Sequence, residues 1–115
     1  MQLPGVVEHE RSWKVRDKLL AWERPLRKTD LAALGVAAPR GPILGIRTVD
    51  VLAKEELLAA MPDVFFTTPH FDGYPAVLAR LPALEVSVLE HLVEEIWRER
   101  APKRVVKQYL AERDR

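Results

Sequence analysis

The sequence contains no cysteine, and this absence excludes several classes of protein. The chain has no disulfide framework, no thiolate zinc site, no iron–sulfur cluster and no cysteine nucleophile. No apolar run approaches the roughly 20 residues that a membrane-spanning helix needs. Residues 1–5 lack the basic and apolar regions of a signal peptide. We therefore expect a cytoplasmic protein with no membrane partner.

Three well-known site patterns are also missing: GxGxxG, GxxxxGK[ST] and HExxH. No cofactor or metal is therefore predicted. The residues that are present, 48% hydrophobic and 30% charged among 115, are typical of a globular protein. A chain of this length buries about two-thirds of its unfolded surface, enough for one core. Residues 1–115 are therefore expected to form a single domain.

Charge is separated along the chain, although the net charge is only +1. Residues 1–28 sum to +3, residues 29–49 to +1, residues 50–97 to −7 and residues 98–115 to +4. Two interpretations remain open at this point. Either the basic ends and the acidic middle are solvated surfaces that attract one another, or one basic end meets an anionic partner.

Five segments have the alternation or the β-branched and aromatic content of strands. They are residues 12–15, 19–23, 43–49, 64–68 and 75–81. A short polar loop, Arg16-Asp17-Lys18, joins the first two as a hairpin. The last two are expected to pair in antiparallel fashion. Residues 3–6 (LPGV) predict a turn, because proline fixes φ and glycine permits a positive φ.

Two helices are predicted between these strands. A short helix over residues 30–34 has Thr29 or Asp30 as its expected cap. Asp50 is expected to cap a longer helix, which ends before Pro62 because proline lacks the backbone N–H that a helix needs.

Two more helices are predicted after the last strand. The first is expected to begin with a capping box of Ser87 and Glu90. Its apolar stripe consists of Val88, Leu89, Leu92, Val93, Ile96 and Trp97. The second begins near Pro102, and its inward residues are Val105, Val106, Tyr109 and Leu110. Strands followed mostly by helices predict an α+β fold, with one antiparallel sheet of about five strands packed by helices and a C-terminal helical pair.

Several blocks, taken in order, resemble the MmcQ/YjbR family. They are LPGV at 3–6, WKV at 13–15, KEELL at 54–58, FFTTPHFDGYPAVL at 65–78, Trp97 and Ala101-Pro102. The resemblance covers nearly the whole chain, and the long block is its most specific part. It implies a YjbR-like domain with a double-wing surface, DNA binding and no enzymatic activity. Members usually begin with a helix before the LPGV turn, which this chain is expected to lack.

Basic residues near the predicted hairpin, loops and strands are the nucleic-acid-binding candidates. They are Arg16, Lys18, Arg24, Arg27, Arg40, Arg47 and Arg80. Such a surface binds phosphates by releasing counterions. The alternative is that these residues form ion pairs or only keep the protein in solution. The first functional hypothesis is a small non-enzymatic DNA-binding domain, as a monomer or a weak homodimer.

A second hypothesis places a small molecule or peptide in a pocket around residues 68–74. The candidate residues are Trp22, Thr68, His70, Asp72 and Tyr74. His70 and Asp72 suggest a general base or two metal ligands, or only a turn. A metal site needs three or four ligands, and His9 and His91 are the only other histidines. Enzymatic activity is the weakest hypothesis, because no nucleophile is identified for the His70–Asp72 pair.

Overall fold

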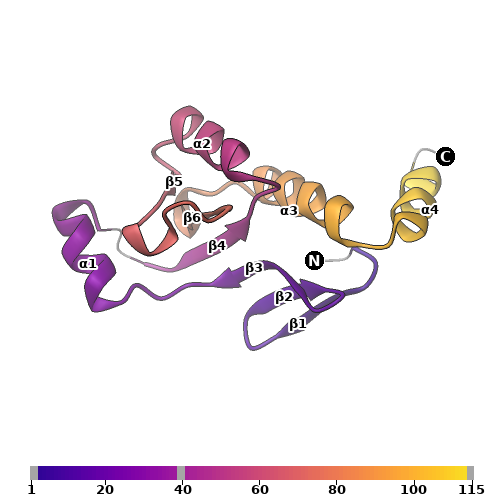
Figure 1. The fold of residues 1–115 in the computed structure, drawn as a ribbon, viewed down its shortest axis with the longest axis horizontal. Helices are drawn as coiled ribbons and strands as arrows, with labels where there is room; N and C mark the ends of the chain where they lie inside the picture. The colour runs from indigo at the N-terminus through magenta and orange to yellow at the C-terminus, as the bar shows by residue number, and fades with distance from the viewer. Residues whose placement is uncertain (1–2, 39–40, 114–115) are drawn as a thin grey trace.

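The computed structural model describes residues 3–38 and 41–113 and shows one antiparallel sheet with helices on both faces (Figure 1). Its strands are β1 (Val6–His9), β2 (Ser12–Val15), β3 (Lys18–Glu23), β4 (Ile43–Arg47), β5 (Phe65–Phe66) and β6 (Ala76–Arg80). The strand order is β1-β2-β3-β4-β6-β5. The predicted α+β class is confirmed, with six strands in place of about five.

The longer helices are α1 (Lys28–Leu34), α2 (Val51–Ala60), α3 (Val86–Arg100) and α4 (Lys103–Arg113). Short 3₁₀ turns are η1 (Gly35–Ala37), η2 (Pro69–Phe71) and η3 (Leu81–Ala83). The molecule is elongated, 48 × 29 × 25 Å, because α1 lies at one end and α4 at the other. Among the described residues, no helix is long and apolar enough to cross a membrane.

Two tight hairpins form the β1–β2–β3 part of the sheet. Arg16 and Asp17 join β2 to β3 with φ values of 51° and 65°, as the predicted polar loop requires. Glu10 and Arg11 join β1 to β2 with φ values of 47° and 61°. Strand β1 was not predicted, because it is a mostly exposed edge strand with no alternating buried face.

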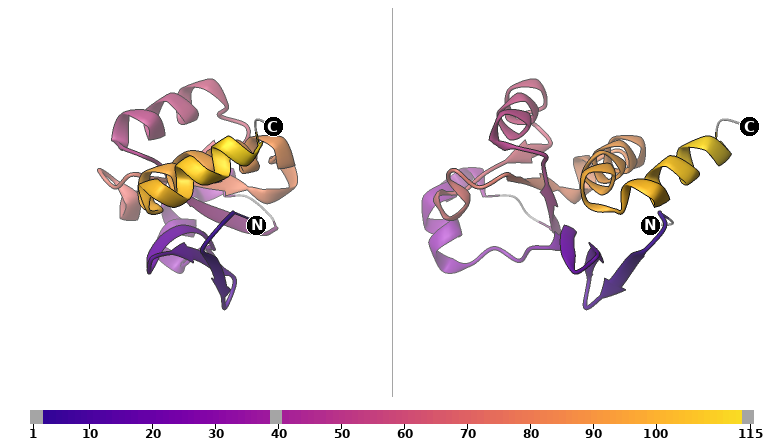
Figure 2. Two further views of the ribbon diagram at one scale, coloured as in Figure 1. Left: turned by 90° about the vertical axis from the view of Figure 1, so that its right-hand side faces the viewer. Right: turned by 45° about the vertical axis from the view of Figure 1, so that its right-hand side comes forward.

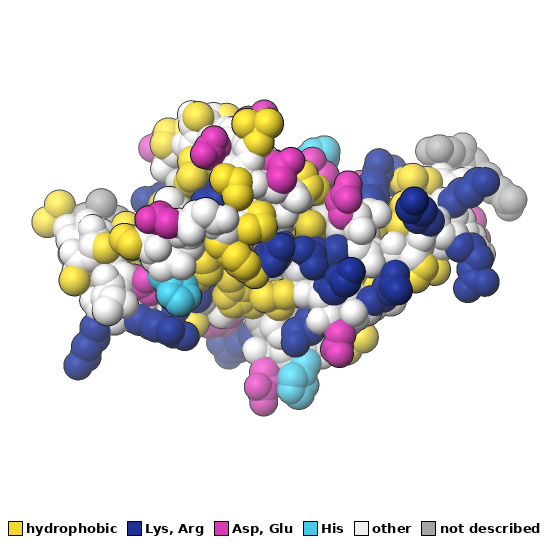
Figure 3. Space-filling model, viewed as in Figure 1, with side chains coloured by type: hydrophobic (Ala, Val, Ile, Leu, Met, Phe, Trp, Pro, Cys, Tyr) yellow, Lys and Arg dark blue, Asp and Glu magenta, His cyan; other side chains and the backbone are white. Residues whose placement is uncertain are grey.

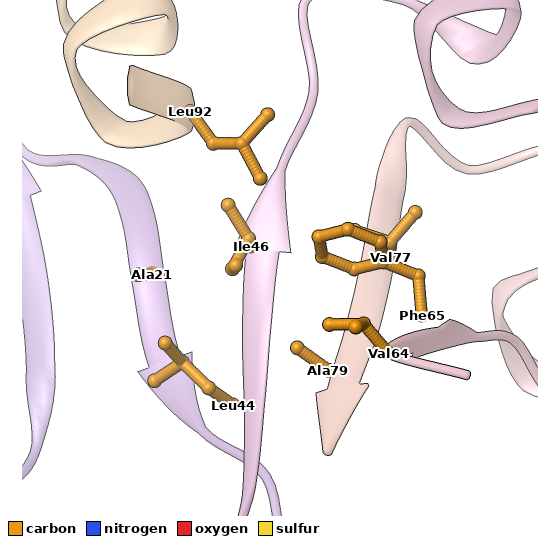
Figure 4. Close-up of a cluster of buried hydrophobic side chains, with 8 residues drawn as sticks. All are labelled: Ala21, Leu44, Ile46, Val64, Phe65, Val77, Ala79 and Leu92. Carbon is orange, nitrogen blue, oxygen red and sulfur yellow. The ribbon is translucent and has the colours of Figure 1, made fainter. Parts of the chain in front are cut away.

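The sheet has a hydrophobic cluster on each face. On one face, helices α2 and α3 cover Ala21, Leu44, Ile46, Val64, Phe65, Val77 and Ala79, and α3 contributes Leu92 to the same cluster (Figure 4). On the other, η2 and α1 cover Ile43, Phe66, Phe71 and Leu78. Because both faces are covered, residues 43–46 and 76–79 are all buried. This explains why the two central strands have continuous apolar runs.

A third cluster joins α3 and α4 to the β1–β2 end of the sheet (Figure 2). Trp97 is completely buried, and its indole Nε1–H donates to the Pro4 carbonyl at 2.8 Å. Its ring meets Tyr109 edge-on, with 5.2 Å between ring centroids. The predicted LPGV turn and the inward stripe of α3 are therefore confirmed, and the two hold each other in place.

Several predicted element boundaries are wrong. Helix α3 begins at Val86 with Glu85 as its N-cap, and no side chain caps it, so the Ser87–Glu90 capping box does not form. The strand predicted over 64–68 is reduced to β5, which ends two residues before the η2 turn begins at Pro69. The strand predicted over 43–49 ends at Arg47.

The two predicted caps before Pro62 have different outcomes. Asp50 caps α2 as predicted and accepts from the Ala53 N–H at 2.7 Å. The first helix, however, begins at Lys28 with Arg27 as its N-cap. Asp30 is therefore the third helical residue, where its carboxylate accepts from the Arg27 N–H at 2.9 Å.

Candidate ligand-binding groove

An open groove of about 770 Å³ lies between two parts of the chain. One side is formed by β3 and the residues that follow it, and the other by the loop that contains η2. Its lining residues are Leu19, Trp22, Glu23, Arg24, Pro25, Leu26, Arg27, His70, Phe71, Asp72, Gly73 and Tyr74. Four of the five predicted pocket residues, Trp22, His70, Asp72 and Tyr74, are thus brought together. The fifth, Thr68, is 1% exposed and does not line the groove.

The floor of the groove depends on the contact between Trp22 and Gly45. These two residues are direct partners across β3 and β4, and the indole lies over the glycine. A Cβ at position 45 would approach two indole ring carbons to 2.5 Å, which no ordinary contact permits. Glycine is therefore required here by the close approach of the ring, and it lets the indole lie flat against the sheet.

Lys54 stabilises the η2 loop, which forms one wall of the groove, and this lysine is only 4% exposed. Its ammonium donates to the carbonyls of Phe71 at 2.6 Å and Tyr74 at 2.9 Å. Burial lowers the pKa of Lys54, and the nearby Asp72 carboxylate opposes this effect. These bonds fix the backbone of the η2 loop, so the wall is built before any ligand arrives.

Sequence reasoning missed this role of Lys54. The available signal was its helical position, because Lys54 precedes Leu57 and Leu58 by three and four residues and so lies on their apolar face.

A buried ion pair supports the groove from below. Arg24 Nη2 lies 3.0 Å from Asp30 Oδ2, and the two side chains are 8% and 2% exposed. The Arg27 backbone N–H and the Arg24 guanidinium lower the pKa of Asp30, and burial of the carboxylate opposes this effect. The Arg24 guanidinium also lies 5.3 Å from the Phe71 ring centroid. The Arg24 side chain is therefore engaged in contacts that stabilise the fold. This corrects the prediction that Arg24 binds phosphates.

Aromatic rings form the accessible part of the groove around the buried Phe71. Trp22 and Tyr74 each lie 6.2 Å from Phe71 between centroids, and His70 meets it edge-on at 4.9 Å. Trp22 is half-buried and Tyr74 is 40% exposed. Hydrophobic side chains gather over the middle of the face drawn in Figure 3, and a group of Lys and Arg side chains lies to their right.

His70 and Asp72, which were considered as a general base or as metal ligands, both line the groove. Within the described part of the chain, no hydrogen bond or ion pair joins them, and no three potential ligands gather for a metal ion. Gly73 has a φ of 72°, as the predicted turn requires. The two side chains are best described as exposed polar groups on the rim of the groove.

The predicted basic residues that the structure describes lie at several separate places on the fold. Arg16 and Lys18 are exposed at the β2–β3 turn, whereas Arg27 is exposed beside the groove. Arg80 donates to the Pro62 carbonyl at 3.2 Å and covers the Phe66 ring. It pairs with Ile43, so it lies at the opposite end of β4 from Arg47. Arg40 lies outside the described residues.

Comparison with known proteins gives close relatives of this chain. It is similar to Uncharacterized protein Rv2570 and Uncharacterized protein MT2646 of Mycobacterium tuberculosis, and to Uncharacterized protein Mb2600 of Mycobacterium bovis. Each is 55% identical over 102 residues, which cover 86% of this chain and 79% of the relative. The chain belongs to the Rv2570 family.

Other comparisons add nothing to this assignment. No protein-family model matches the chain, and no solved structure is significantly similar to it. Membership of the MmcQ/YjbR family therefore stays a prediction. The names of the Rv2570 family state no activity, so a function for this chain must be argued from the groove.

Proposed function

We propose that this member of the Rv2570 family is a non-enzymatic binding protein whose groove takes a small molecule or short peptide with a flat apolar part. The observation that carries the proposal is the convergence of Trp22, His70 and Tyr74 on one hollow of about 770 Å³. Ligand sites in proteins typically measure about 300–1,000 Å³ and combine aromatic walls with a few polar groups.

The groove is preorganised by contacts that involve no ligand. The Trp22–Gly45 contact sets the floor, Lys54 fixes the wall, and the Arg24–Asp30 pair supports the base. A ligand therefore binds without the entropic cost of ordering these groups. Exposed Arg27 and Asp72 lie at the rim and offer one charge of each sign for orientation.

A thermal-shift screen tests this proposal, because a ligand that binds only the native state raises the melting temperature. The panel contains aromatic carboxylates, aromatic phosphates, nucleosides and aromatic tripeptides. We expect hits whose effect is lost in Tyr74→Ser and kept in Leu52→Ser. Leu52 is a suitable control because it is 64% exposed on α2, away from the groove. A panel without hits, or hits that survive Tyr74→Ser, would contradict the proposal.

Nucleic-acid binding is a second candidate, favoured by the exposure of Arg16 and Lys18 on a tight hairpin. In the part of the chain that is described, neither side chain forms an ion pair, so both are available to phosphates. The test is fluorescence polarisation with random-sequence duplex and single-stranded DNA, at low and near-physiological salt. Binding should weaken steeply with salt and be lost in Arg16→Ala/Lys18→Ala. Unchanged binding in this double variant would remove the wing model.

A further inference from the structure

Gly73 lines the groove through its backbone, because it has no side chain. Apart from its neighbours in the chain, nothing lies within 4 Å of the position that a Cβ would occupy there. The N–H and the carbonyl of Gly73 form no hydrogen bond with any residue of 3–38 or 41–113. The η2 wall of the groove therefore presents a free peptide group to open space.

Leu26 offers a second free peptide group from the opposite wall, which it lines half-buried. The preceding Pro25 has no N–H, and its carbonyl accepts from the Arg24 guanidinium at 2.6 Å. The N–H and the carbonyl of Arg27 are both bound to residues at the start of α1. The N–H and the carbonyl of Leu26, by contrast, form no hydrogen bond with another described residue. Each wall thus has one residue whose donor and acceptor are both free.

The backbone beside these free groups is extended. Arg27 has φ −90° and ψ 167°, and Asp72 has φ −57° and ψ 129°. A ligand peptide in an extended conformation presents its N–H and carbonyl groups alternately to its two sides. It can therefore bond to Gly73 on one side and to Leu26 on the other. In binding modes of this kind, main-chain hydrogen bonds give affinity and side-chain pockets give specificity.

The charges that line the groove leave one positive side chain without a partner. The charged residues that have a partner are Glu23 with Arg11 at 2.9 Å, Arg24 with Asp30 at 3.0 Å, and Asp72, which attracts the Lys54 ammonium bound to the same loop. Arg27 is exposed and forms no ion pair with any residue that the structure describes. An acidic group on the ligand would therefore be complementary to this wall.

We propose that the groove binds a short extended peptide in which an aromatic residue lies close to an acidic one. The aromatic side chain contacts Trp22 and Tyr74, and the acidic side chain meets Arg27. The peptide main chain bonds to Leu26 and Gly73. A small aromatic molecule uses the rings alone, whereas a peptide also supplies donors and acceptors to both walls. This inference rests on the proposed function, because it names the ligand of the same groove.

Nuclear magnetic resonance titration of the ¹⁵N-labelled wild-type protein tests the inference. The probes are the acetylated and amidated tripeptides Ala-Phe-Glu and Glu-Phe-Ala, and phenyl phosphate, which has a ring and an anion but no peptide group. We expect the tighter tripeptide to bind at least about 10-fold more tightly than phenyl phosphate, because it gains main-chain hydrogen bonds. Only the tripeptide should move the amide proton signals of Leu26 and Gly73 downfield, as hydrogen bonding does.

Ester analogues of the tighter tripeptide test the main-chain contacts without altering the protein. Replacing either amide that flanks the phenylalanine with an ester removes one N–H and keeps the shape of the ligand. Each ester should weaken binding by about 3- to 10-fold, because the carbonyl of Leu26 or of Gly73 loses its donor. If neither ester weakens binding by more than about twofold, the main-chain contacts do not form and the inference is overturned.

Matched variants test the acidic side chain. Arg27→Gln should weaken binding of the tripeptide by about 2- to 5-fold at low salt, as expected for an exposed ion pair. Lys28→Gln is the control, because it removes an exposed positive charge at the next position, which does not line the groove. A tripeptide with glutamine in place of glutamate should not respond to Arg27→Gln. Equal effects of Arg27→Gln and Lys28→Gln would overturn the choice of an acidic ligand.

Failure of this inference and failure of the proposed function give different results. If phenyl phosphate binds in the groove as tightly as the tripeptides, the groove is a small-molecule site and the peptide inference is wrong. If neither phenyl phosphate nor a tripeptide shifts the Trp22 indole signal, the proposed function is wrong as well. A tripeptide whose affinity is unchanged in Tyr74→Ser binds elsewhere, and this result would also overturn the inference.

Discussion

Replacing Gly45 with alanine should destabilise the protein through one contact, the one with the Trp22 ring. The added Cβ would lie 2.5, 2.5 and 2.8 Å from three carbon atoms of the indole. The backbone itself is not strained, because Gly45 is not among the residues with positive φ. Without the ring, alanine in a strand would instead stabilise the fold by about 0.5–1 kcal/mol relative to glycine.

The expected magnitude follows from the freedom of the ring to move. Overpacking in a closed core costs about 1–3 kcal/mol. Trp22 is half-buried with one side on the open groove, so it can tilt outward and relieve part of the clash. We therefore expect Gly45→Ala to lower the free energy of unfolding by about 1 kcal/mol, or the melting temperature by about 4 °C.

A double-mutant cycle isolates the contact. In a Trp22→Ala background the clash cannot occur, so Gly45→Ala should raise the free energy of unfolding by about 0.5 kcal/mol. The assay is urea unfolding followed by far-ultraviolet circular dichroism, which does not depend on the removed tryptophan. If Gly45→Ala destabilises both backgrounds equally, the ring is not the reason for the glycine, and this account of the groove floor is wrong.

Three other residues give predictions of their own. Lys54→Met should lower the free energy of unfolding by about 2 kcal/mol, because two buried carbonyls lose a charged donor. Amide hydrogen exchange should become faster in residues 70–74, and unchanged exchange would refute the anchoring role. Asp30→Asn should cost about 3 kcal/mol at neutral pH, because it leaves the Arg24 charge buried and unpaired. The pKa of Asp30 is lowered on folding, so its contribution is complete above the ordinary aspartate pKa and is lost as pH falls through the folded value. Wild type should therefore lose more stability than Asp30→Asn in acid unfolding, and parallel pH curves would contradict this. Trp97→Phe should cost about 2 kcal/mol through the lost bond to Pro4 and the smaller ring, as measured by urea unfolding. A loss below about 0.5 kcal/mol would show that this contact is dispensable.

Elements with strong local signals were predictable from the sequence. The β2–β3 hairpin has alternating residues on either side of a polar turn, and α3 has an apolar stripe at helical spacing. The two central strands are continuous apolar runs, because clusters cover both of their faces. In each case, the physical cause of the element lies within about 15 residues of sequence.

Features that depend on distant residues were not predictable in this way. The edge strand β1 is defined by its pairing with β2 and buries little of its own surface. The Arg24–Asp30 pair looks like two surface charges in the sequence, and only the packing of η2 against α1 buries it. The Lys54 ammonium and the Phe71 carbonyl that accepts from it are 17 residues apart.

The candidate site shows the same division. The aromatic residues at 22, 70 and 74 were predicted as one pocket because they are dense and close to turns, and the structure brings them together. Thr68 was predicted in the same pocket but is buried and does not line the groove, because tertiary packing decides which side chains of this segment face it.

The most direct test of the central claim is ¹H–¹⁵N chemical-shift mapping of the wild-type protein with phenyl phosphate. The three tryptophans serve as internal reporters, because only Trp22 lines the groove and the Trp97 indole N–H is bound to Pro4. We predict saturable shifts of the Trp22 indole and the amides of residues 70–74, with the Trp97 indole unmoved. No saturable shift, or shifts centred outside the groove, would contradict the account.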